Sequence, residues 1–175
     1  VANNGWRPLT EIELKMKEIN AANPEVGDIR FNEFDGDIAL MVTGGGGGSI
    51  AFDTLLNEGV HPATTFDITN GEIEDKVCEA TKLILSKPGL KGLLAGANFS
   101  NFFPVDHKVK GIVRALKELN VDGHSFPVVM RFCGPKQEEA RQLAETVPGI
   151  EFYDESVSIE QAARRICELV KQGVK

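Results

Sequence analysis

The feature that most constrains the fold is an apolar segment, residues 38–43 (IALMVT), that runs directly into five consecutive glycines and then Ser49. Glycine lets the backbone adopt positive φ angles and approach a ligand closely. Serine is favoured at helix N-caps, so we expect a helix over residues 49–57. The N-terminus of a helix binds anions through free N–H groups and the helix dipole. The pattern therefore predicts a phosphate or carboxylate site at residues 44–49; the alternative is a flexible turn.

Composition and charge narrow the class of protein. The 175 residues suffice for one domain, and no apolar run approaches the roughly 20 residues that cross a bilayer. A formal net charge of −7 with scattered lysines argues against nucleic-acid binding, which needs a basic face. Cys78, Cys133 and Cys167 have no metal-ligand spacing. We therefore expect a cytoplasmic protein without a membrane segment, a nucleic-acid partner or a structural metal.

The amino-terminal part is expected to be the tail of a preceding region. Thr10 and Glu13 form a T-x-x-E capping box, which predicts a helix over residues 10–22. Asp35-Gly36 separates the strand-like segments 29–34 and 37–42, and this dipeptide favours the type I′ turn of a β-hairpin. We therefore assign residues 1–35 to an N-terminal helix and hairpin strand, and residues 36–175 to one domain.

The rest of the chain alternates short apolar strands with amphipathic helices. The expected strands are 63–68, 91–97, 126–132 and 150–153, and the expected helices are 49–57, 73–85, 106–119, 136–146 and one that starts at Ser158, where Ser158 and Gln161 form a second capping box. Short β-branched apolar strands are typical of a parallel sheet buried on both faces. We therefore predict an α/β fold: a flavodoxin-like, doubly wound, mainly parallel five-stranded sheet with helices on both faces, plus the N-terminal helix and an antiparallel hairpin strand.

Ligands of doubly wound folds bind beyond the carboxyl ends of the strands. Here those ends carry glycine, amide, hydroxyl and arginine side chains and few carboxylates. A phosphotransfer receiver needs acids where this chain has Gly44 and Asn98, so we exclude that class. The glycines match only part of G-x-G-x-x-G, with Asp67 where a ribose-binding acid would lie. A Rossmann-like nucleotide-binding domain and a non-catalytic anion-binding module stay open as alternatives.

Three segments resemble a known family. Residues 36–72 resemble the start of the ligase-CoA domain that ends the β subunit of succinyl-CoA synthetase, and the register holds without gaps from Ile38 to Gly71. Residues 97–115 stand in the place of that family's N-I-F-G-G-I-V loop and following helix, and residues 126–135 in that of its V-V-V-R strand. The resemblance covers residues 29–170, and the order and spacing of the segments carry it more than any single motif.

Two loops depart from the succinyl-CoA synthetase pattern. Thr69-Asn70-Gly71 stands where that family has three glycines, and Phe99-Ser100-Asn101 where it has F-G-G. The A-N-F-S-N and R-x-x-G-P segments, residues 97–101 and 131–135, instead resemble ATP-citrate lyase and citryl-CoA synthetase, in which an A-N-F-T-N-like loop contributes to the citrate site. Citrate offers more hydrogen-bond acceptors than succinate, so the added donors favour citrate, with succinate or another dicarboxylate next.

The resemblance implies a relay. ATP or GTP, with Mg, phosphorylates a histidine, the phosphoryl group passes to the substrate carboxylate, and the thiol of coenzyme A attacks the acyl phosphate. In this family the phosphohistidine and most of the coenzyme A site belong to an α-type ligase subunit or domain, and an ATP-grasp domain lies upstream. We therefore expect a fragment or split subunit of an acid–thiol ligase that holds none of these cofactors by itself, contains no catalytic residue and is inactive alone.

The predicted substrate-binding residues are Gly44, Gly45, Gly46, Gly47, Gly48, Ser49, Thr69, Asn70, Gly71, Asn98, Phe99, Ser100, Asn101 and Arg131. The amides and the Ser100 hydroxyl can donate hydrogen bonds to an acid, and Arg131 can bind a carboxylate through two bonds. The competing interpretation of Arg131 is an ion pair with a neighbouring helix. The helix at residue 106 should present its N-terminus to the site and stabilise a phosphoryl group during transfer.

Other polar and aromatic side chains are expected to have ordinary roles. The three histidines, His61, His107 and His124, are expected to be surface residues, and Asp53 and Asp67 to accept hydrogen bonds near the loops rather than act as bases. Phe99, Phe102 and Phe103 are expected to form a packing or interface cluster, on the face that meets the α subunit in the family.

Overall fold

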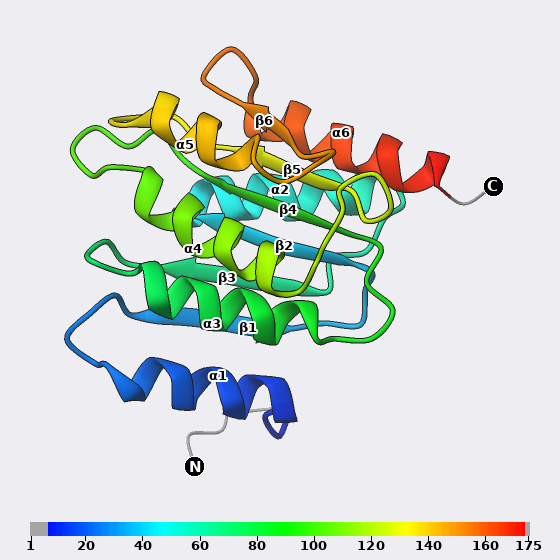
Figure 1. Ribbon diagram of the computed structural model, residues 1–175. Helices are drawn as coiled ribbons and strands as arrows, with labels where there is room; N and C mark the ends of the chain where they lie inside the picture. Colours follow the sequence, from blue (N-terminus) through cyan, green and yellow to red (C-terminus); the bar gives the residue numbers. More distant parts are fainter. Residues whose placement is uncertain (1–6, 174–175) are drawn as a thin grey trace.

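A four-stranded parallel sheet forms the centre of the computed structural model, which describes residues 7–173 (Figure 1). In spatial order its strands are β2 (Ile38–Thr43), β4 (Gly92–Ala97), β5 (Val128–Arg131) and β6 (Glu151–Tyr153). β2 and β4 pair over their whole length, with Ile38 opposite Gly92 and Thr43 opposite Ala97. Both strands are buried throughout, as expected of a parallel sheet covered on two faces. The predicted doubly wound α/β fold is confirmed, with four parallel strands where five were predicted, because the strand at residues 64–68 pairs outside this sheet.

Two further strands, β1 (Ile29–Glu33) and β3 (Thr64–Ile68), form an antiparallel pair at the edge of this sheet. β3 lies between β1 and β2 (Figure 1). A single bridge, Ile38 opposite Pro62, joins the pair to β2, and the Thr64 hydroxyl accepts a hydrogen bond of 3.1 Å from the Leu40 backbone N–H. The antiparallel strand predicted beside β2 therefore lies one strand further out, and the predicted β-hairpin is wrong.

The hairpin fails because the connection at Asp35-Gly36 is not a type I′ turn. That turn needs a positive φ at both central residues, and Gly36 does not have one. Instead, the backbone N–H of Phe34 donates to the Ala63 carbonyl at 2.8 Å, and that of Asp37 donates to the His61 carbonyl at 2.9 Å. The chain before β3 thus binds both ends of the connection and lies between the two strands expected to pair.

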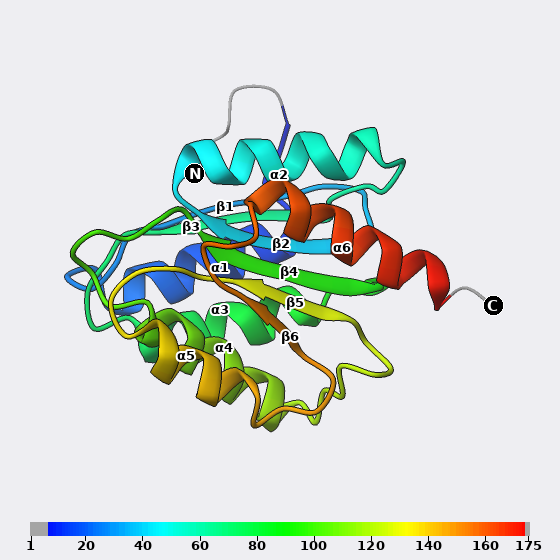
Figure 2. The same ribbon diagram turned by 90° about the horizontal axis from the view of Figure 1, so that it is seen from above.

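Helices cover both faces of the sheet (Figure 2). α2 (Gly45–Asn57) and α6 (Ile159–Gln172) lie on one face, and α3 (Glu74–Leu85), α4 (Asp106–Glu118) and α5 (Gln137–Ala144) lie on the other. Side chains alternate along β2: Ile38 and Leu40 belong to the core under α2 and α6, whereas Ala39 and Met41 belong to the core under α3 and α4. These two hydrophobic cores fix the strand ends relative to one another. No helix of residues 7–173 is both long and apolar enough to cross a membrane.

α1 (Glu11–Ala22) packs against β1 and α3 at the edge of the molecule (Figure 1). Both predicted capping boxes are confirmed, at Thr10 with Glu13 and at Ser158 with Gln161. Each pair exchanges two hydrogen bonds between side chain and backbone, which satisfies N–H groups that the first turn of a helix leaves free.

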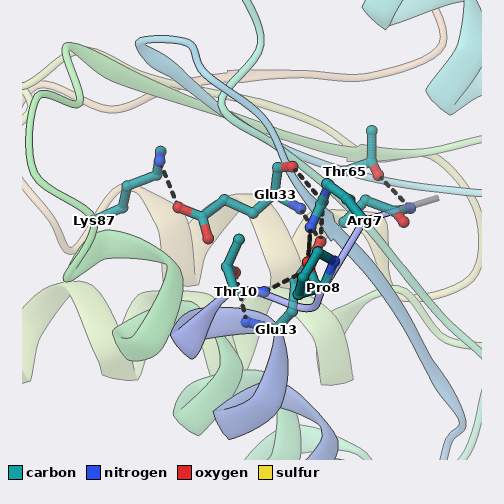
Figure 3. Close-up of polar contacts among 8 residues, drawn as sticks. Arg7, Pro8, Thr10, Glu13, Glu33, Thr65 and Lys87 are labelled. Carbon is teal, nitrogen blue, oxygen red and sulfur yellow. Dashed lines mark hydrogen bonds and ion pairs between the residues drawn. The ribbon is translucent and has the colours of Figure 1, made fainter. Parts of the chain in front are cut away.

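Glu13 also ties α1 to the chain around it (Figure 3). Its buried carboxylate accepts hydrogen bonds from both terminal nitrogens of Arg7, at 2.8 and 2.7 Å, and from the backbone N–H of Glu33 at 3.0 Å. The bonds from Arg7 are the main cause that lowers the pKa of Glu13 to about 2, against the opposing effect of burial. Glu13 therefore holds the end of β1 against α1 as a charged group.

Lys76 of α3 makes the second polar connection to α1. Its buried ammonium donates hydrogen bonds to the backbone carbonyls of Asn20, Asn23 and Gly27, at 3.1, 2.7 and 2.8 Å, and to the side-chain oxygen of Asn20 at 3.3 Å. Burial lowers the pKa of Lys76. We call the contacts of Glu13 and Lys76 with their neighbours the α1 corner.

Candidate anion-binding site

A cavity of about 240 Å³ lies at the carboxyl ends of β2, β3 and β4, where the loops after β3 and β4 project at the left of Figure 1. We call it the strand-end pocket. Six predicted substrate-binding residues line it: Gly44, Thr69, Asn70, Asn98, Phe99 and Ser100. Its other polar side chains are those of Thr43, Asp67 and Lys108. The position is the one at which doubly wound folds bind ligands.

The remaining predicted residues lie elsewhere. Gly45, Gly48 and Ser49 line a separate groove between α2 and the β1–β3 pair, together with Phe34 and Phe52. Gly46, Gly47, Gly71, Asn101 and Arg131 are not part of the lining of the strand-end pocket. The fold therefore divides the glycine tract, and only its first residue reaches the pocket.

The glycine tract is helical rather than a loop, which corrects the predicted helix start at Ser49. α2 begins at Gly45, and the backbone N–H of Gly48 already donates to the Gly44 carbonyl at 3.1 Å. Ser49 lies within the helix, and its hydroxyl donates to the Gly45 carbonyl at 3.0 Å. Only Gly44 in the tract has a positive φ, of 90°. Gly44 is therefore the N-cap of α2, and the glycines that follow it form the first turn of the helix. Ser49 cannot be the N-cap because it lies inside the helix.

Two of the glycines make room for Asn98. A Cβ at Gly44 would lie 2.9 Å from the side-chain nitrogen of Asn98, and a Cβ at Gly47 would overlap the Asn98 side-chain oxygen. A Cβ at Gly46, by contrast, would meet nothing within 4 Å. The close approach of α2 to Asn98 is therefore a physical reason for glycine at Gly44 and Gly47.

The loop after β4 is stabilised by its own hydrogen bonds. The Ser100 hydroxyl donates to the Phe103 carbonyl at 2.5 Å and accepts from the Phe103 N–H at 3.2 Å. The Ser100 backbone N–H donates to the Cys133 carbonyl at 3.0 Å, which joins this loop to the end of β5. The Ser100 hydroxyl was predicted to donate to a substrate, but it donates its hydrogen to the backbone of the same loop.

Arg131 connects strand ends instead of pairing with a helix carboxylate. Its Nε donates to the Val157 carbonyl at 2.9 Å, and its Nη1 donates to the Ala97 carbonyl at 3.0 Å. Ala97 directly precedes Asn98. Arg131 therefore holds the backbone from which the Asn98 side chain extends.

Thr69 is likewise engaged with the backbone. Its hydroxyl accepts a hydrogen bond of 2.7 Å from the Asp28 N–H, and its own N–H donates to the Asp28 carbonyl at 3.1 Å. Asn70 is exposed at the pocket, and Gly71 has a positive φ of 148°. The loop after β3 thus joins the start of β1 to the pocket wall.

Lys108 lies in the first turn of α4 and is not among the residues predicted from the sequence. Its Nζ donates to the Thr43 hydroxyl at 3.1 Å, at the end of β2. Burial lowers the pKa of Lys108, and the charge of Asp67 opposes this effect. A lysine at the N-terminus of a helix is disfavoured by the helix dipole, and that unfavourable position after a polar loop was the available signal. Asp67 itself accepts a hydrogen bond of 3.1 Å from the Gly44 N–H, as expected of a hydrogen-bonding residue.

Two helix N-termini meet at the pocket. The N-cap residues are Gly44 for α2 and Val105 for α4, and both line the pocket without a side-chain cap. The positive ends of both helix dipoles therefore lie at the pocket, which makes its rim favourable for an anion.

The other predicted roles concern metals, thiols and aromatic side chains. Within residues 7–173, no three His, Cys, Asp or Glu side chains gather in a way that could hold a metal ion. Cys78, Cys133 and Cys167 are buried and free. Phe99, Phe102 and Phe103 are all exposed on the loop after β4, and Phe99 and Phe103 also line the pocket.

The doubly wound sheet with a polar pocket at its strand ends defines the class of the protein, an α/β domain whose site is built by loops and helix N-termini. Comparison with known proteins narrows this class. No protein-family model matches the chain. The chain is 33% identical, over 144 residues, to the β subunit of ADP-forming succinate–CoA ligase from Desulfurococcus amylolyticus, which covers 82% of this chain and 36% of that one.

Two further β subunits of the same ligase match in the same way. The subunit from Staphylococcus saprophyticus is 32% identical over 158 residues, which is 90% of this chain and 38% of that one. The subunit from a Roseiflexus species is 34% identical over 139 residues, which is 78% of this chain and 36% of that one. The chain thus spans less than half the length of these relatives.

Two solved structures share the fold. An ATP-citrate lyase from Methanothrix soehngenii, in complex with citrate and coenzyme A, superposes with a TM-score of 0.76 at 23% identity, over 93% of this chain and 46% of that one. An ATP-citrate lyase variant from Methanosaeta concilii, in complex with (3S)-citryl-CoA, gives 0.73 at 24% identity, over 91% and 43%. The chain therefore belongs to the family of the ligase-CoA domain of succinate–CoA ligase β subunits, and it shares its fold with ATP-citrate lyase.

Proposed function

We propose that this chain is the ligase domain of a nucleotide-dependent acid–CoA ligase, and that its strand-end pocket binds a di- or tricarboxylate, with citrate preferred over succinate. The succinate–CoA ligase relatives support the reaction class. The A-N-F-S-N loop, with polar side chains where glycines stand in the succinyl-CoA synthetase pattern, supports the preference for the more polar acid.

The observation that carries the proposal is the position of Asn98. Its side chain lines the pocket and lies so close to α2 that Gly44 and Gly47 leave room for it. An asparagine amide offers two donors to a carboxylate, and the uncapped N-termini of α2 and α4 favour a negative charge at the same place. Amide donors and helix dipoles together stabilise an acid better than they would a neutral ligand.

The size of the pocket also favours a small acid. Its volume of about 240 Å³ lies below the roughly 300–1,000 Å³ of pockets that enclose drug-sized ligands. A compact di- or tricarboxylate suits such a space better than a dinucleotide or coenzyme A. This supports the proposal over the Rossmann-like alternative.

Arg131 and Ser100 were expected from the sequence to bind the acid directly, and we propose a different role for each of them. Arg131 does not line the strand-end pocket, and its Nε and Nη1 donate to the Val157 and Ala97 carbonyls. We therefore assign Arg131 the positioning of Asn98 through Ala97, and Ser100 the shape of the loop.

In the complete enzyme this chain would bind and orient the acid, and the N-terminus of α4 would stabilise negative charge on it during phosphoryl transfer. Formation of acyl-CoA further requires a phosphohistidine, coenzyme A and a Mg-bound ATP or GTP. We expect these from an α-type subunit or domain and an upstream ATP-grasp domain, in the cytoplasm. The purified 175-residue chain is accordingly expected to form no acyl-CoA from citrate, ATP and coenzyme A until those parts are added.

Calorimetric titration with citrate and succinate tests the proposal. The parent chain should bind citrate more tightly than succinate. Asn98→Ala should weaken citrate binding by about 1 kcal/mol, the usual net value of a hydrogen bond, whereas Asn57→Ala at the far end of α2 should change nothing. If the parent binds neither acid, or Asn98→Ala binds citrate as the parent does, the pocket is not the acid site.

A further inference from the structure

Among the residues that the structure describes, one cationic side chain lines the strand-end pocket, that of Lys108. An ammonium group has three N–H donors. Within residues 7–173, Lys108 uses one of them, in the hydrogen bond of 3.1 Å to the Thr43 hydroxyl, and it forms no ion pair with a carboxylate. Two of its donors are therefore left without a protein acceptor.

The surroundings of Lys108 compensate its charge only in part. Within residues 7–173, Asp67 is the only carboxylate that lines the pocket, and its Oδ1 already accepts from the Gly44 N–H. The other polar side chains of the lining are neutral hydroxyls and amides. The dipole of α4 further opposes a positive charge in its first turn. Partial burial, incomplete hydrogen bonding and the dipole all destabilise the cation, and an anion in the pocket would relieve all three.

The neighbouring lysine of the same helix shows the contrast. Lys110, two residues further along α4, lies 2.8 Å from the buried carboxylate of Asp106. Lys110 and Asp106 line another surface hollow, outside the strand-end pocket. Removing Lys110 therefore tests a lysine of the same helix that has its own partner.

We propose that Lys108 binds the anionic oxygens of the ligand in the strand-end pocket, in the first place the substrate carboxylate, and so acts beside Asn98 as a substrate-binding residue. This inference rests on the proposed function of the pocket. The positive charge that binds the acid then comes from Lys108 in the first turn of α4 and not, as expected from the sequence, from Arg131.

The experiment is calorimetric titration of the parent chain, Lys108→Met, Lys108→Arg and Lys110→Met with citrate and with inorganic phosphate. Methionine keeps the apolar length of the side chain and removes the charge. Lys108→Met should weaken citrate binding about tenfold or more, the loss expected for a charge-assisted hydrogen bond. Lys110→Met should stay within about twofold, because Lys110 lies outside the strand-end pocket, and Lys108→Arg should recover part of the affinity. Stronger loss for citrate than for phosphate identifies the carboxylate as the ligand group, and the reverse overturns that assignment.

The pH dependence separates a binding role from a structural one. Because burial lowers the pKa of Lys108, citrate binding by the parent should weaken as the pH rises through that pKa, below the ordinary 10.5. Lys108→Met and Lys108→Arg should both lose this decline. Asp67 lines the same pocket as Lys108, and Asp106 and His107 precede Lys108 on α4, so His107→Gln is measured in parallel and should keep the decline.

The outcomes are distinct for the two proposals. If Lys108→Met binds citrate as the parent does, with the same pH profile, this inference is overturned, and the proposed function stands if Asn98→Ala still loses affinity. If the parent binds neither citrate, succinate nor phosphate, both fail. Amide spectra that match the parent establish that each variant is folded, and Lys108→Arg gives the answer should Lys108→Met unfold.

Discussion

Lys76 and Lys108 are two lysines withdrawn from water in different parts of the molecule, and their surroundings differ. In both, burial lowers the pKa. In the α1 corner, four oxygen atoms surround the ammonium of Lys76. In the strand-end pocket, the Thr43 hydroxyl is the one hydrogen-bond acceptor that Lys108 has within residues 7–173.

The difference shows how a buried or half-buried cation can be assigned to structure or to binding. Lys76 satisfies the carbonyls at the end of α1 and in the loop that follows, so its contacts already compensate part of its lost hydration. Lys108 keeps free donors in a cavity at the strand ends, where a ligand can supply the missing acceptors. We therefore expect changes at the α1 corner to alter stability and changes at the pocket to alter binding.

The largest effect on stability is expected from Lys76→Met. Three backbone carbonyls, of which that of Gly27 is buried, lose a charged donor, which should lower the free energy of unfolding by about 3 kcal/mol. Urea unfolding followed by circular dichroism measures this loss. Lys15→Met, at an exposed i,i+4 pair with Glu11, is the matched control and should cost less than about 0.5 kcal/mol. A variant that unfolds like the parent, or that loses citrate affinity at full stability, would break the division between the two lysines.

A somewhat smaller effect is expected from Glu13. Its pKa of about 2 in the folded chain lies below the ordinary 4.5, so its stabilisation is complete above pH 4.5 and is lost as the pH falls toward 2. Because Arg7 is 42% exposed, solvent screens the pair, and we expect about 2 kcal/mol rather than the full shift. Glu13→Gln should therefore be less stable than the parent at pH 7, and the gap should close toward pH 2. Glu11→Gln serves as control; a constant gap at all pH values would contradict the assignment.

Whether the fold and site could be predicted from the sequence depended on how local the responsible contacts are. The capping boxes at Thr10 and Ser158 were predictable because three residues fix each one. The parallel sheet followed from apolar β-branched segments. The β1–β3 pairing depends on residues more than thirty positions apart, such as Phe31 opposite Phe66, and no local turn signal reveals it.

The site was predicted in part for the same reason. Asn98 and Gly44 follow strands directly, so the rule for strand ends places them at the pocket. Arg131 is the last residue of β5, but the nearby Ala97 and Val157 carbonyls accept its hydrogen bonds, and only the tertiary structure shows this. Lys108 reaches the pocket because its side chain extends from the first turn of α4 to the Thr43 hydroxyl, a long-range contact that the sequence does not specify.

The smallest effects on binding and stability are expected in the glycine tract, where Gly47→Ala and Gly46→Ala form a matched pair of variants. Gly47→Ala should displace the Asn98 side chain and weaken citrate binding by about 1 kcal/mol. Gly46→Ala has open space and a helical position, so it should leave binding unchanged and stabilise the chain by about 0.5–1 kcal/mol. Calorimetry and urea unfolding of both variants measure the contrast. Equal citrate binding by the two variants would show that the close approach of α2 to Asn98 does not matter for binding.

The central claim, that the strand-end pocket binds a carboxylate, is tested most directly by titrating the ¹⁵N-labelled chain with citrate and following the backbone amide signals. The account predicts the largest shifts at Gly44, Asn98 and Lys108, and unchanged signals for Glu13 and Lys76 in the α1 corner. Shifts centred on the groove beside Ser49, or no shifts at millimolar citrate, would contradict it.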